Sequence, residues 1–207
     1  MGESMKVANI VHGSAIYGPG SRTVVWAQGC SIRCPGCWNE NLWTFDGGRE
    51  VSEEEIVRAA TDSDDCGITI LGGEPLDQAE ETHRLISLAK MSGLNTFLYT
   101  GYEDYEVDGT RAQCVADACI VVIGRYRHSL RSEELLWRGS TNQRIIWNDP
   151  YLAQGDDLSD RRMVELSIDE ETKTMSILGY PSEKMISEVT NRMVTLRSAF
   201  TVKELEK

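Results

Sequence analysis

The sequence predicts an α/β fold, in which strands and helices alternate along the chain. Short β-branched runs end in glycine-rich loops and are followed by helical patterns, which is the order of elements in βα units. Of the 207 residues, 41% are hydrophobic and 26% are charged, as is ordinary for a globular domain. We therefore expect one α/β domain, with at most a short appendage.

The elements of this domain can be taken in order from the N-terminus. The first helix begins at the capping box Ser52–Glu55 and continues with apolar residues at helical spacing. A second helix is expected over Gln78–Met91, and a short third one over Arg111–Ala116. The expected strands are residues 6–11, 23–28, 67–71, 95–100, 119–123 and 143–147.

The C-terminal part of the chain has a different character. Val164–Ile168 and Thr174–Leu178 alternate apolar and polar residues, which predicts a β-hairpin. A helical pattern then begins at Pro181. We expect residues 1–150 to form the main domain and residues 151–207 to form a small appendage, a hairpin plus a helix.

Charge and hydropathy exclude several classes of protein. The net charge is −12, with 21 Lys and Arg against 33 Asp and Glu, so a general nucleic-acid binder is not expected. An apolar stretch long enough to span a membrane does not occur, and the N-terminus lacks the basic start and apolar run of a secretory signal. We expect a cytoplasmic protein with no nucleic-acid or membrane partner.

The six cysteines divide into a tight group and three scattered residues. Cys30, Cys34 and Cys37 have the spacing C-x3-C-x2-C. A secreted disulfide framework does not fit a chain of this size without a signal, and a tight cysteine group in a reducing compartment more often binds metal. We expect the scattered cysteines to be small buried hydrophobic residues: Cys66, Cys114 and Cys119.

The tight group suits an iron–sulfur cluster. Thiolates are preferred ligands of iron, and three of them on one loop can hold a cubane whose fourth iron has no protein ligand. Such an open iron can chelate a substrate. A four-cysteine zinc or ferredoxin site stays open as an alternative, although the chain has no second C-x2-C pair and no histidine close to this loop.

A second motif follows the predicted strand at residues 67–71. Gly72-Gly73-Glu74-Pro75 lies where α/β barrels place their active sites, at the carboxyl end of a strand. Glycines there let a backbone approach a ligand closely, and a carboxylate can meet an amino group. A plain strand-to-helix turn would use the same residues and is the alternative.

The cysteine motif and the Gly72–Pro75 motif, together with several others, are similar to the motifs of a known family. The motifs, in order, are Gly18-Pro19-Gly20-Ser21-Arg22, Gln28-Gly29-Cys30, Cys34-Pro35-Gly36-Cys37-Trp38-Asn39, Gly72-Gly73-Glu74-Pro75-Leu76, Tyr99-Thr100-Gly101-Tyr102 and Trp137-Arg138-Gly139-Ser140-Thr141-Asn142-Gln143. The chain resembles the radical S-adenosylmethionine (SAM) activating proteins of glycyl radical enzymes, and in particular the activases of anaerobic (class III) ribonucleotide reductases. The resemblance covers about residues 5–148.

The resemblance implies a set of site residues. Cys30, Cys34 and Cys37 would ligate a [4Fe–4S] cluster, and SAM would chelate the open iron through its amino and carboxylate groups. The methionine end of SAM would lie at the Gly72-Gly73-Glu74 segment and the adenine near Gly36–Trp38. Cofactor contacts are thus implied for Gly36, Cys37, Trp38, Gly72, Gly73, Glu74 and Thr100.

The resemblance also implies a fold and a reaction. The fold would be a partial parallel (βα) barrel of the radical SAM type, with a small C-terminal α/β appendage. SAM would be cleaved reductively to a 5′-deoxyadenosyl radical that abstracts hydrogen from a glycine of a partner, most simply an anaerobic ribonucleotide reductase. A flavodoxin or ferredoxin would donate the electron.

Two other functions stay open on the sequence. One is a radical SAM paralogue that modifies a peptide or a small molecule. The other is a non-catalytic iron–sulfur or zinc interaction module.

Overall fold

The computed structural model describes residues 4–132, 135–153, 164–169, 174–179, 185, 187–189 and 201–203. The chain divides into two compact units, residues 1–160 and residues 161–207. The first unit contains an α/β domain and the second contains a small sheet.

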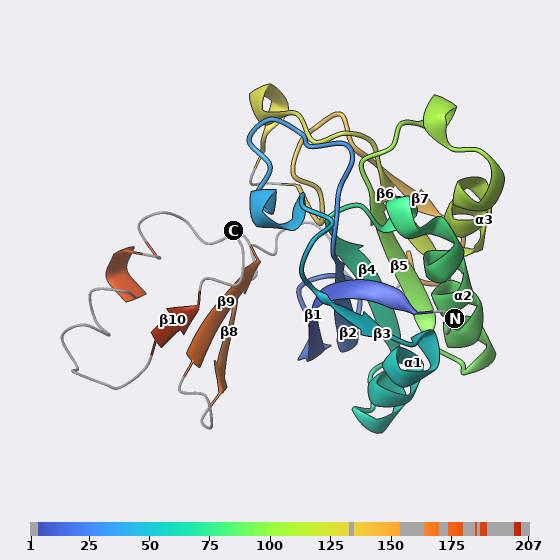
Figure 1. The fold of residues 1–207 in the computed structure, drawn as a ribbon, viewed down its shortest axis with the longest axis horizontal. Helices are drawn as coiled ribbons and strands as arrows, with labels where there is room; N and C mark the ends of the chain where they lie inside the picture. Colours follow the sequence, from blue (N-terminus) through green and yellow to red (C-terminus); the bar gives the residue numbers. More distant parts are fainter. Residues whose placement is uncertain are drawn as a thin grey trace. The chain divides into compact units, whose positions relative to one another are not determined.

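The first unit is built on one β-sheet with helices packed against it (Figure 1). Within the described residues this sheet has seven strands in the order β3-β1-β2-β4-β5-β6-β7. The strands are β1 (Met5–Ser14), β2 (Arg22–Ala27), β3 (Arg49–Val51), β4 (Gly67–Gly72), β5 (Asn95–Thr100), β6 (Ile120–Ile123) and β7 (Arg144–Trp147). The helices are α1 (Glu53–Asp62), α2 (Ala79–Met91) and α3 (Gly109–Asp117), with short 3-10 helices η1 (Glu40–Leu42), η2 (Pro75–Gln78), η3 (Asp104–Glu106) and η4 (His128–Leu130).

The centre of the sheet is parallel and its edges are antiparallel. β2, β4, β5 and β6 pair in parallel, whereas β1 pairs antiparallel with β2 and with β3, and β7 pairs antiparallel with β6. The short connection from β1 to β2 explains the first reversal, because a parallel pair needs a long crossover between its strands. The α/β class with a parallel centre is confirmed, and β3 is a strand that the sequence did not predict.

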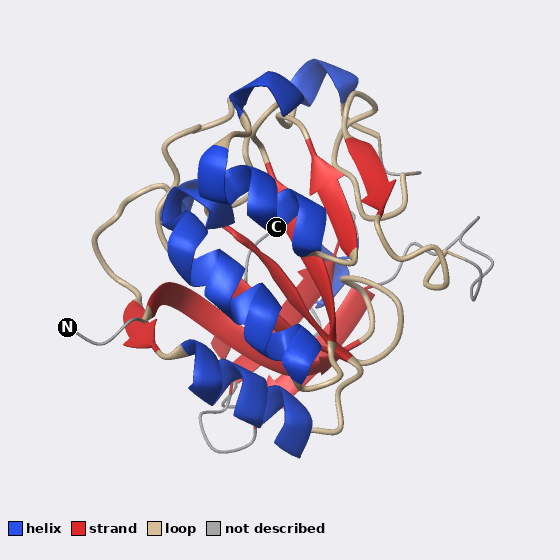
Figure 2. Ribbon diagram, turned by 90° about the vertical axis from the view of Figure 1, so that its right-hand side faces the viewer, coloured by secondary structure: helices blue, strands red, loops and turns tan. Residues whose placement is uncertain are grey.

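The helices cover one face of this sheet, where Figure 2 shows them side by side. α1 begins where the sequence predicts, because the Ser52 hydroxyl accepts a hydrogen bond from the Glu55 amide at 3.2 Å. Its buried residues Ile56, Val57 and Ala60 lie in the main core. Among the described residues, no helix is long and apolar enough to cross a membrane.

A smaller apolar cluster lies on strand residues of β5 and β6 that alternate with those of the main core. It contains Phe97, Ile120, Val122 and Trp137. The Trp137 ring meets the Phe97 ring edge-on, with centroids 5.2 Å apart. The segment that leads into β7 is thereby anchored to the sheet.

The Gly-Pro-Gly-Ser-Arg motif is part of the scaffold. Arg22 is fully buried at the start of β2, and its Nε donates to the Thr69 hydroxyl at 2.7 Å. Its Nη2 donates to the Ile68 carbonyl at 3.1 Å, and its Nη1 donates to the Asn95 side chain. Burial lowers the pKa of Arg22 to about 10. Arg22 therefore ties together the amino ends of β2, β4 and β5, away from the carboxyl ends where the cysteines follow.

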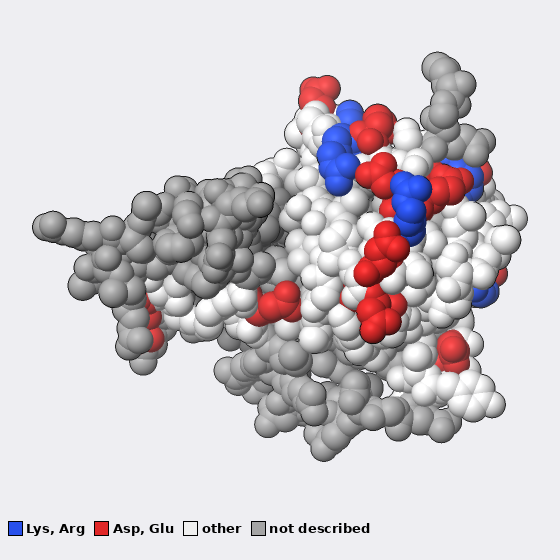
Figure 3. Space-filling model, turned by 90° about the horizontal axis from the view of Figure 1, so that it is seen from below, with Lys and Arg blue, Asp and Glu red and all other residues white. Residues whose placement is uncertain are grey.

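Ion pairs join neighbouring elements of the first unit. Arg84 of α2 lies 3.3 Å from the buried Glu53 carboxylate of α1 and 3.4 Å from that of Glu81. Arg49 of β3 lies 3.8 Å from Glu55. Figure 3 shows acidic and basic side chains close together on the face seen from below, so this face carries charge of both signs.

The second unit contains the predicted hairpin strands. β8 (Val164–Asp169) and β9 (Thr174–Gly179) pair antiparallel, which confirms both strands. β10 (Thr201–Lys203) adds a parallel partner to β9 that the sequence did not predict. Met185 and residues 187–189 are helical, whereas the turn at residues 170–173 and the start of the expected helix at Pro181 lie outside the described residues.

Candidate iron–sulfur and S-adenosylmethionine site

The residues singled out by the sequence meet at one edge of the sheet. The cysteine loop, residues 30–37, follows the carboxyl end of β2, and the Gly72–Pro75 segment begins at the end of β4. Thr100 is the last residue of β5. Because β2, β4 and β5 run parallel, their carboxyl ends lie side by side.

The cysteine loop is folded tightly on itself. The Cys37 amide donates a hydrogen bond to the Cys34 carbonyl at 3.0 Å, which closes a turn over Pro35 and Gly36. Gly36 has a φ of 73°, a conformation that glycine adopts without the steric cost that a Cβ brings. Arg33, which does carry a Cβ, also has a positive φ of 52°. Backbone held in this region tends to be found at functional sites.

Burial and nearby backbone groups act in opposite directions on the pKa values of the first two cysteines. Burial raises the pKa of the Cys30 thiol to about 11, against backbone hydrogen bonds from Arg33 and Ile32 that lower it. Burial also raises the pKa of the Cys34 thiol, against a hydrogen bond from the backbone of Tyr126. Binding to a metal removes the thiol proton, so donors to sulfur stabilise the bound thiolate.

The third cysteine completes a donor set that fits an iron–sulfur cluster. The Cys37 sulfur accepts a hydrogen bond from the Asn39 amide at 3.4 Å. Within the described parts of the chain, no group of three His, Cys, Asp or Glu side chains is arranged to hold a single metal ion. A cubane places each thiolate on a different iron, so its ligands do not need to converge on one point.

The Gly72–Pro75 segment packs directly on the residues that precede the cysteines. The Gly73 amide donates to the Ala27 carbonyl, and the Glu74 amide donates to the Gly29 carbonyl, both at 2.8 Å. A Cβ added to Gly73 would lie 2.1 Å from the Gly29 carbonyl oxygen. Gly73 is therefore required for the contact between two backbones, a reason that the sequence alone does not reveal.

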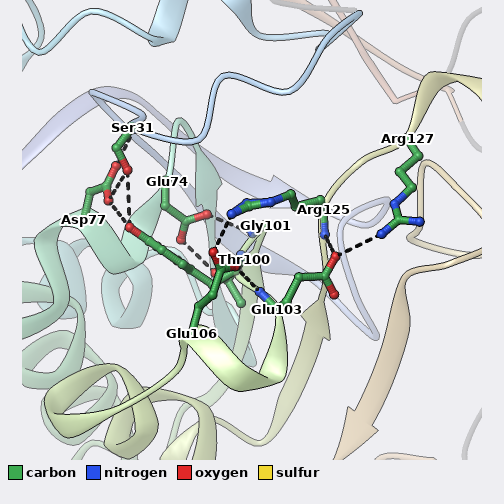
Figure 4. A network of polar contacts seen from close by, with 10 residues as sticks. Ser31, Glu74, Asp77, Thr100, Gly101, Glu103, Glu106, Arg125 and Arg127 are labelled. Atoms are coloured by element: carbon green, nitrogen blue, oxygen red, sulfur yellow. Dashed lines mark hydrogen bonds and ion pairs between the residues drawn. The ribbon is translucent and has the colours of Figure 1, made fainter.

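Glu74 and Thr100 are brought together in the interior (Figure 4). The Glu74 Oε1 atom accepts hydrogen bonds from the Thr100 hydroxyl at 2.8 Å and the Leu76 amide at 2.9 Å. Its Oε2 atom accepts one from the Gly101 amide at 2.8 Å. Burial raises the pKa of Glu74 to about 7, although these hydrogen bonds lower it. The carboxylate thus joins the carboxyl ends of β4 and β5.

A second carboxylate holds the start of the cysteine loop, and the sequence analysis missed it. Asp77 accepts hydrogen bonds from the Ser31 amide at 2.6 Å and from the Ser31 hydroxyl at 2.8 Å. The Tyr102 hydroxyl donates to the same carboxylate at 2.6 Å, and the Arg111 guanidinium lies 4.1 Å from the centre of the Tyr102 ring. The available signal was an acidic residue three positions after Glu74, at the start of a helix.

The segment at residues 124–131, which follows β6, lies against the second half of the cysteine loop. A Cβ added to Gly36 would be 3.1 Å from the His128 Nδ1 atom. The Arg131 guanidinium lies 4.6 Å from the centre of the Trp38 ring. Gly36 and Trp38 are therefore in contact with this segment.

The scattered cysteines lie elsewhere, and the expectation that all three are buried is wrong: Cys114 is buried, Cys119 is partly exposed and Cys66 is exposed. Cys66 immediately precedes β4 and Cys119 precedes β6, so both are at the amino ends of strands, opposite the cysteine loop. Cys114 is buried in α3, where its thiol donates to the Ala79 carbonyl at 3.3 Å. Burial raises the pKa of Cys114 to about 12.

Comparison of the sequence with known proteins assigns the chain to a family. The protein family described as "4Fe-4S single cluster domain" matches residues 16–146 of the sequence. Anaerobic ribonucleoside-triphosphate reductase-activating proteins are 30% identical over 138 residues in Salmonella typhimurium and over 137 residues in Escherichia coli. Each alignment spans 62% of this chain and 89% of the relative.

The chain belongs to the family of glycyl-radical-enzyme activating proteins. The pyruvate formate-lyase-activating enzyme of Clostridium pasteurianum is a further relative, 38% identical over 100 residues, which are 44% of this chain and 42% of that enzyme. As a member of this family, the present protein is a radical SAM enzyme, and its cofactors are a [4Fe–4S] cluster and SAM.

A solved structure of low sequence identity also matches this chain. The crystal structure of QueE from Escherichia coli gives a TM-score of 0.46 at 10% sequence identity. The superposition covers 97% of this chain and 94% of that one.

Proposed function

We propose that Cys30, Cys34 and Cys37 hold the [4Fe–4S] cluster of this activase, and that SAM binds its open iron beside Gly72–Glu74. The contact between the two segments carries this proposal, because the Glu74 amide donates to the Gly29 carbonyl next to Cys30. Three thiolates leave one iron of the cubane open. A ligand bound there would lie beside the carboxyl ends of β2 and β4.

The residues of this edge would bind and orient SAM. The Glu74 Oε2 atom accepts from Gly101 and keeps a lone pair that an ammonium group can use. Thr100 would act through Glu74, to which its hydroxyl donates. Gly36, Cys37 and Trp38 would flank the adenine. Gly36 and Trp38 also pack against residues 124–131, which would form the other side of this part of the site.

When bound, the reduced cluster and SAM supply a 5′-deoxyadenosyl radical that abstracts a hydrogen atom from the substrate. The chain supplies the positions of the two cofactors and a buried, hydrogen-bonded surrounding for them. Glu74 is fully enclosed, and Asp77 keeps the start of the cysteine loop in place.

We further propose that the substrate is a glycine of an anaerobic ribonucleoside-triphosphate reductase. The support is that relatives with this name align over 89% of their own length, whereas the pyruvate formate-lyase relative aligns over 42%. The matched region, residues 16–146, also contains the Trp137–Gln143 motif. A flavodoxin or ferredoxin as electron donor, and a cytoplasmic location, belong to the same proposal.

Electron paramagnetic resonance tests the whole proposal. The full chain, reconstituted anaerobically with iron and sulfide, is incubated with SAM, a reductant and an anaerobic reductase. A glycyl doublet on the reductase is the expected result. SAM cleavage without a doublet would instead favour a paralogue that acts on a peptide or small molecule.

The cysteine assignment has its own test. Cys30→Ala, Cys34→Ala and Cys37→Ala should each lose the cluster absorbance, because each removes one of three thiolate ligands. Cys66→Ala, Cys114→Ala and Cys119→Ala are the matched controls, and we expect them to bind iron like wild type. Equal loss in both sets would refute the assignment.

A further inference from the structure

The turn formed by Asn39 and η1 follows the third cysteine and has no part in the function described so far. The carbonyl of Leu42, its last residue, accepts a hydrogen bond from the Gly29 amide at 3.0 Å. The same carbonyl would be 3.1 Å from a Cβ added to Gly73. The turn therefore lies directly against the backbone beside which SAM is proposed to bind.

Asn39 contacts both parts of the proposed site. Its backbone amide donates to the Cys37 sulfur at 3.4 Å. Its side-chain Nδ2 atom donates to the carbonyl of Gly72, the last residue of β4, at 3.5 Å. One residue thus joins a proposed cluster ligand to the start of the Gly72–Pro75 segment.

The group that Asn39 holds is the peptide group between two glycines. Glycine has more conformational freedom than any other residue, so two in succession need outside contacts to fix them. The Gly73 amide donates to the Ala27 carbonyl at 2.8 Å, and Gly72 has a φ of 109°. The Gly72 carbonyl belongs to the same peptide group as that amide. Ala27 and Asn39 therefore hold this peptide group from opposite ends and fix its orientation.

We propose that Asn39 is a positioning residue for SAM: its side chain holds the Gly72–Gly73 peptide group in the orientation that receives the methionine end of SAM. This inference rests on the proposed function, in which SAM binds beside this segment. A backbone that is already fixed loses little conformational entropy when the ligand binds, so affinity is higher. The side chain of Asn39 thereby strengthens SAM binding, whereas its hydrogen bond to the Cys37 sulfur belongs to the backbone and does not depend on the side chain.

The test is an anaerobic titration of the reduced, cluster-loaded full chain with SAM. Samples are frozen immediately after mixing and read by electron paramagnetic resonance, because a ligand on the open iron changes the spectrum of the cluster. Asn39→Ala is compared with Asn41→Ala, which changes an exposed asparagine of η1. The Kd for SAM should rise about two- to tenfold in Asn39→Ala, the effect of losing roughly one hydrogen bond, and should stay at the wild-type value in Asn41→Ala.

The cluster itself provides the second readout. Iron content and the spectrum without SAM should be those of wild type in Asn39→Ala, because the N–H group at the Cys37 sulfur remains. A Kd equal to that of Asn41→Ala would overturn the inference. Loss of iron with an unchanged Kd per cluster would also overturn it, since Asn39 would then only support the cysteine loop.

A second variant keeps the test decisive if Asn39→Ala does not fold. Asn39→Asp has the same shape but replaces the Nδ2 donor with an acceptor. Its added negative charge would attract the sulfonium cation, so weaker binding has to come from the lost donor. The Kd should rise, and an unchanged or lower Kd would overturn the inference. Failure of the proposed function looks different, because SAM would then leave the spectrum of the wild-type cluster unchanged.

Discussion

At the scale of single residues, the glycines of this site serve backbone packing. The space where Gly73 would carry a Cβ is occupied by the Gly29 carbonyl, next to the first cysteine. The sequence interpretation was different, since it expected the glycines of Gly72–Pro75 to let the backbone approach a ligand closely. Because Gly29 directly precedes Cys30, a side chain at Gly73 would displace the cysteine loop.

We predict that Gly73→Ala loses most of its iron. A Cβ placed 2.1 Å from the Gly29 oxygen must push the two backbones apart, at a cost of about 1–3 kcal/mol. Iron per chain after anaerobic reconstitution and the melting temperature of the apoprotein are the measurements. Gly93→Ala is the control, since its Cβ would meet nothing within 4 Å although its φ is 78°. A fully loaded Gly73→Ala would contradict this account.

Glu74 makes stability depend on pH. Burial raises its pKa to about 7, above the value of about 4.3 in an unfolded chain. The unfolded state therefore loses this proton first as pH rises, and the folded state is left to bear the cost of a buried charge. The stability linked to Glu74 is fully present below about pH 4 and is lost as pH rises through about 7.

We predict that Glu74→Gln removes this dependence. Between pH 5 and pH 8 the wild-type apoprotein should lose on the order of 2–3 kcal/mol relative to the variant. Urea unfolding at several pH values measures the difference. Glu54→Gln, an exposed change on α1, is the control for the loss of a surface carboxylate. Parallel curves for Glu74→Gln would show that its carboxyl group titrates normally.

At the scale of elements, the cysteine loop is held by η2 and by the residues after β5. Asp77 in η2 contacts Ser31 through both the backbone and the side chain, and Tyr102 donates to the same carboxylate. These contacts connect three stretches that lie at the carboxyl ends of β2, β4 and β5. A substitution in one of these stretches should therefore change how much the contacts of the other two contribute to stability.

A double-mutant cycle on Asp77→Ala and Tyr102→Phe measures this connection. We expect a coupling energy of about 1–2 kcal/mol in apoprotein stability, because a partly buried hydrogen bond to a carboxylate joins the two residues. The exposed pair Thr110 and Glu80, whose oxygens are 2.6 Å apart, is the matched control. Its coupling should be close to zero, and a similar value for both pairs would refute the special role of Asp77.

At the scale of the whole molecule, the division into two compact units bears on the C-terminal region. The boundary between the units falls between Asp160 and Arg161. Leu152, before that boundary, packs against the cluster that contains Phe97 and Trp137. The proposed domain limit at residue 150 would remove Leu152, whereas a limit at residue 160 keeps it.

We predict that residues 1–160 bind the cluster and cleave SAM in the absence of a partner, because a compact unit with its own hydrophobic core can fold independently. Residues 1–150 should be less stable by about 1–2 kcal/mol, through loss of the Leu152 contact. Iron content, SAM cleavage and urea unfolding of the two fragments check this. An insoluble or iron-free 1–160 fragment would show that residues 161–207 are part of the fold.

The sequence by itself determined the features whose signal is local. The α/β class follows from short runs and their periodicity, and the start of α1 follows from a capping box within four residues. The cofactor chemistry follows from the spacing of Cys30, Cys34 and Cys37 and from Gly72–Pro75. The cofactor contacts and the domain limits remain predictions.

Only the tertiary structure decided which distant residues complete the site. Asp77 is 46 positions from Ser31, and Gly73 is 44 positions from Gly29, so neither contact leaves a periodic signal along the chain. Asn39 likewise contacts Gly72 through a hydrogen bond to the end of β4. Such contacts form because parallel strands bring their carboxyl ends to one edge, and the order of those strands is a property of the folded sheet.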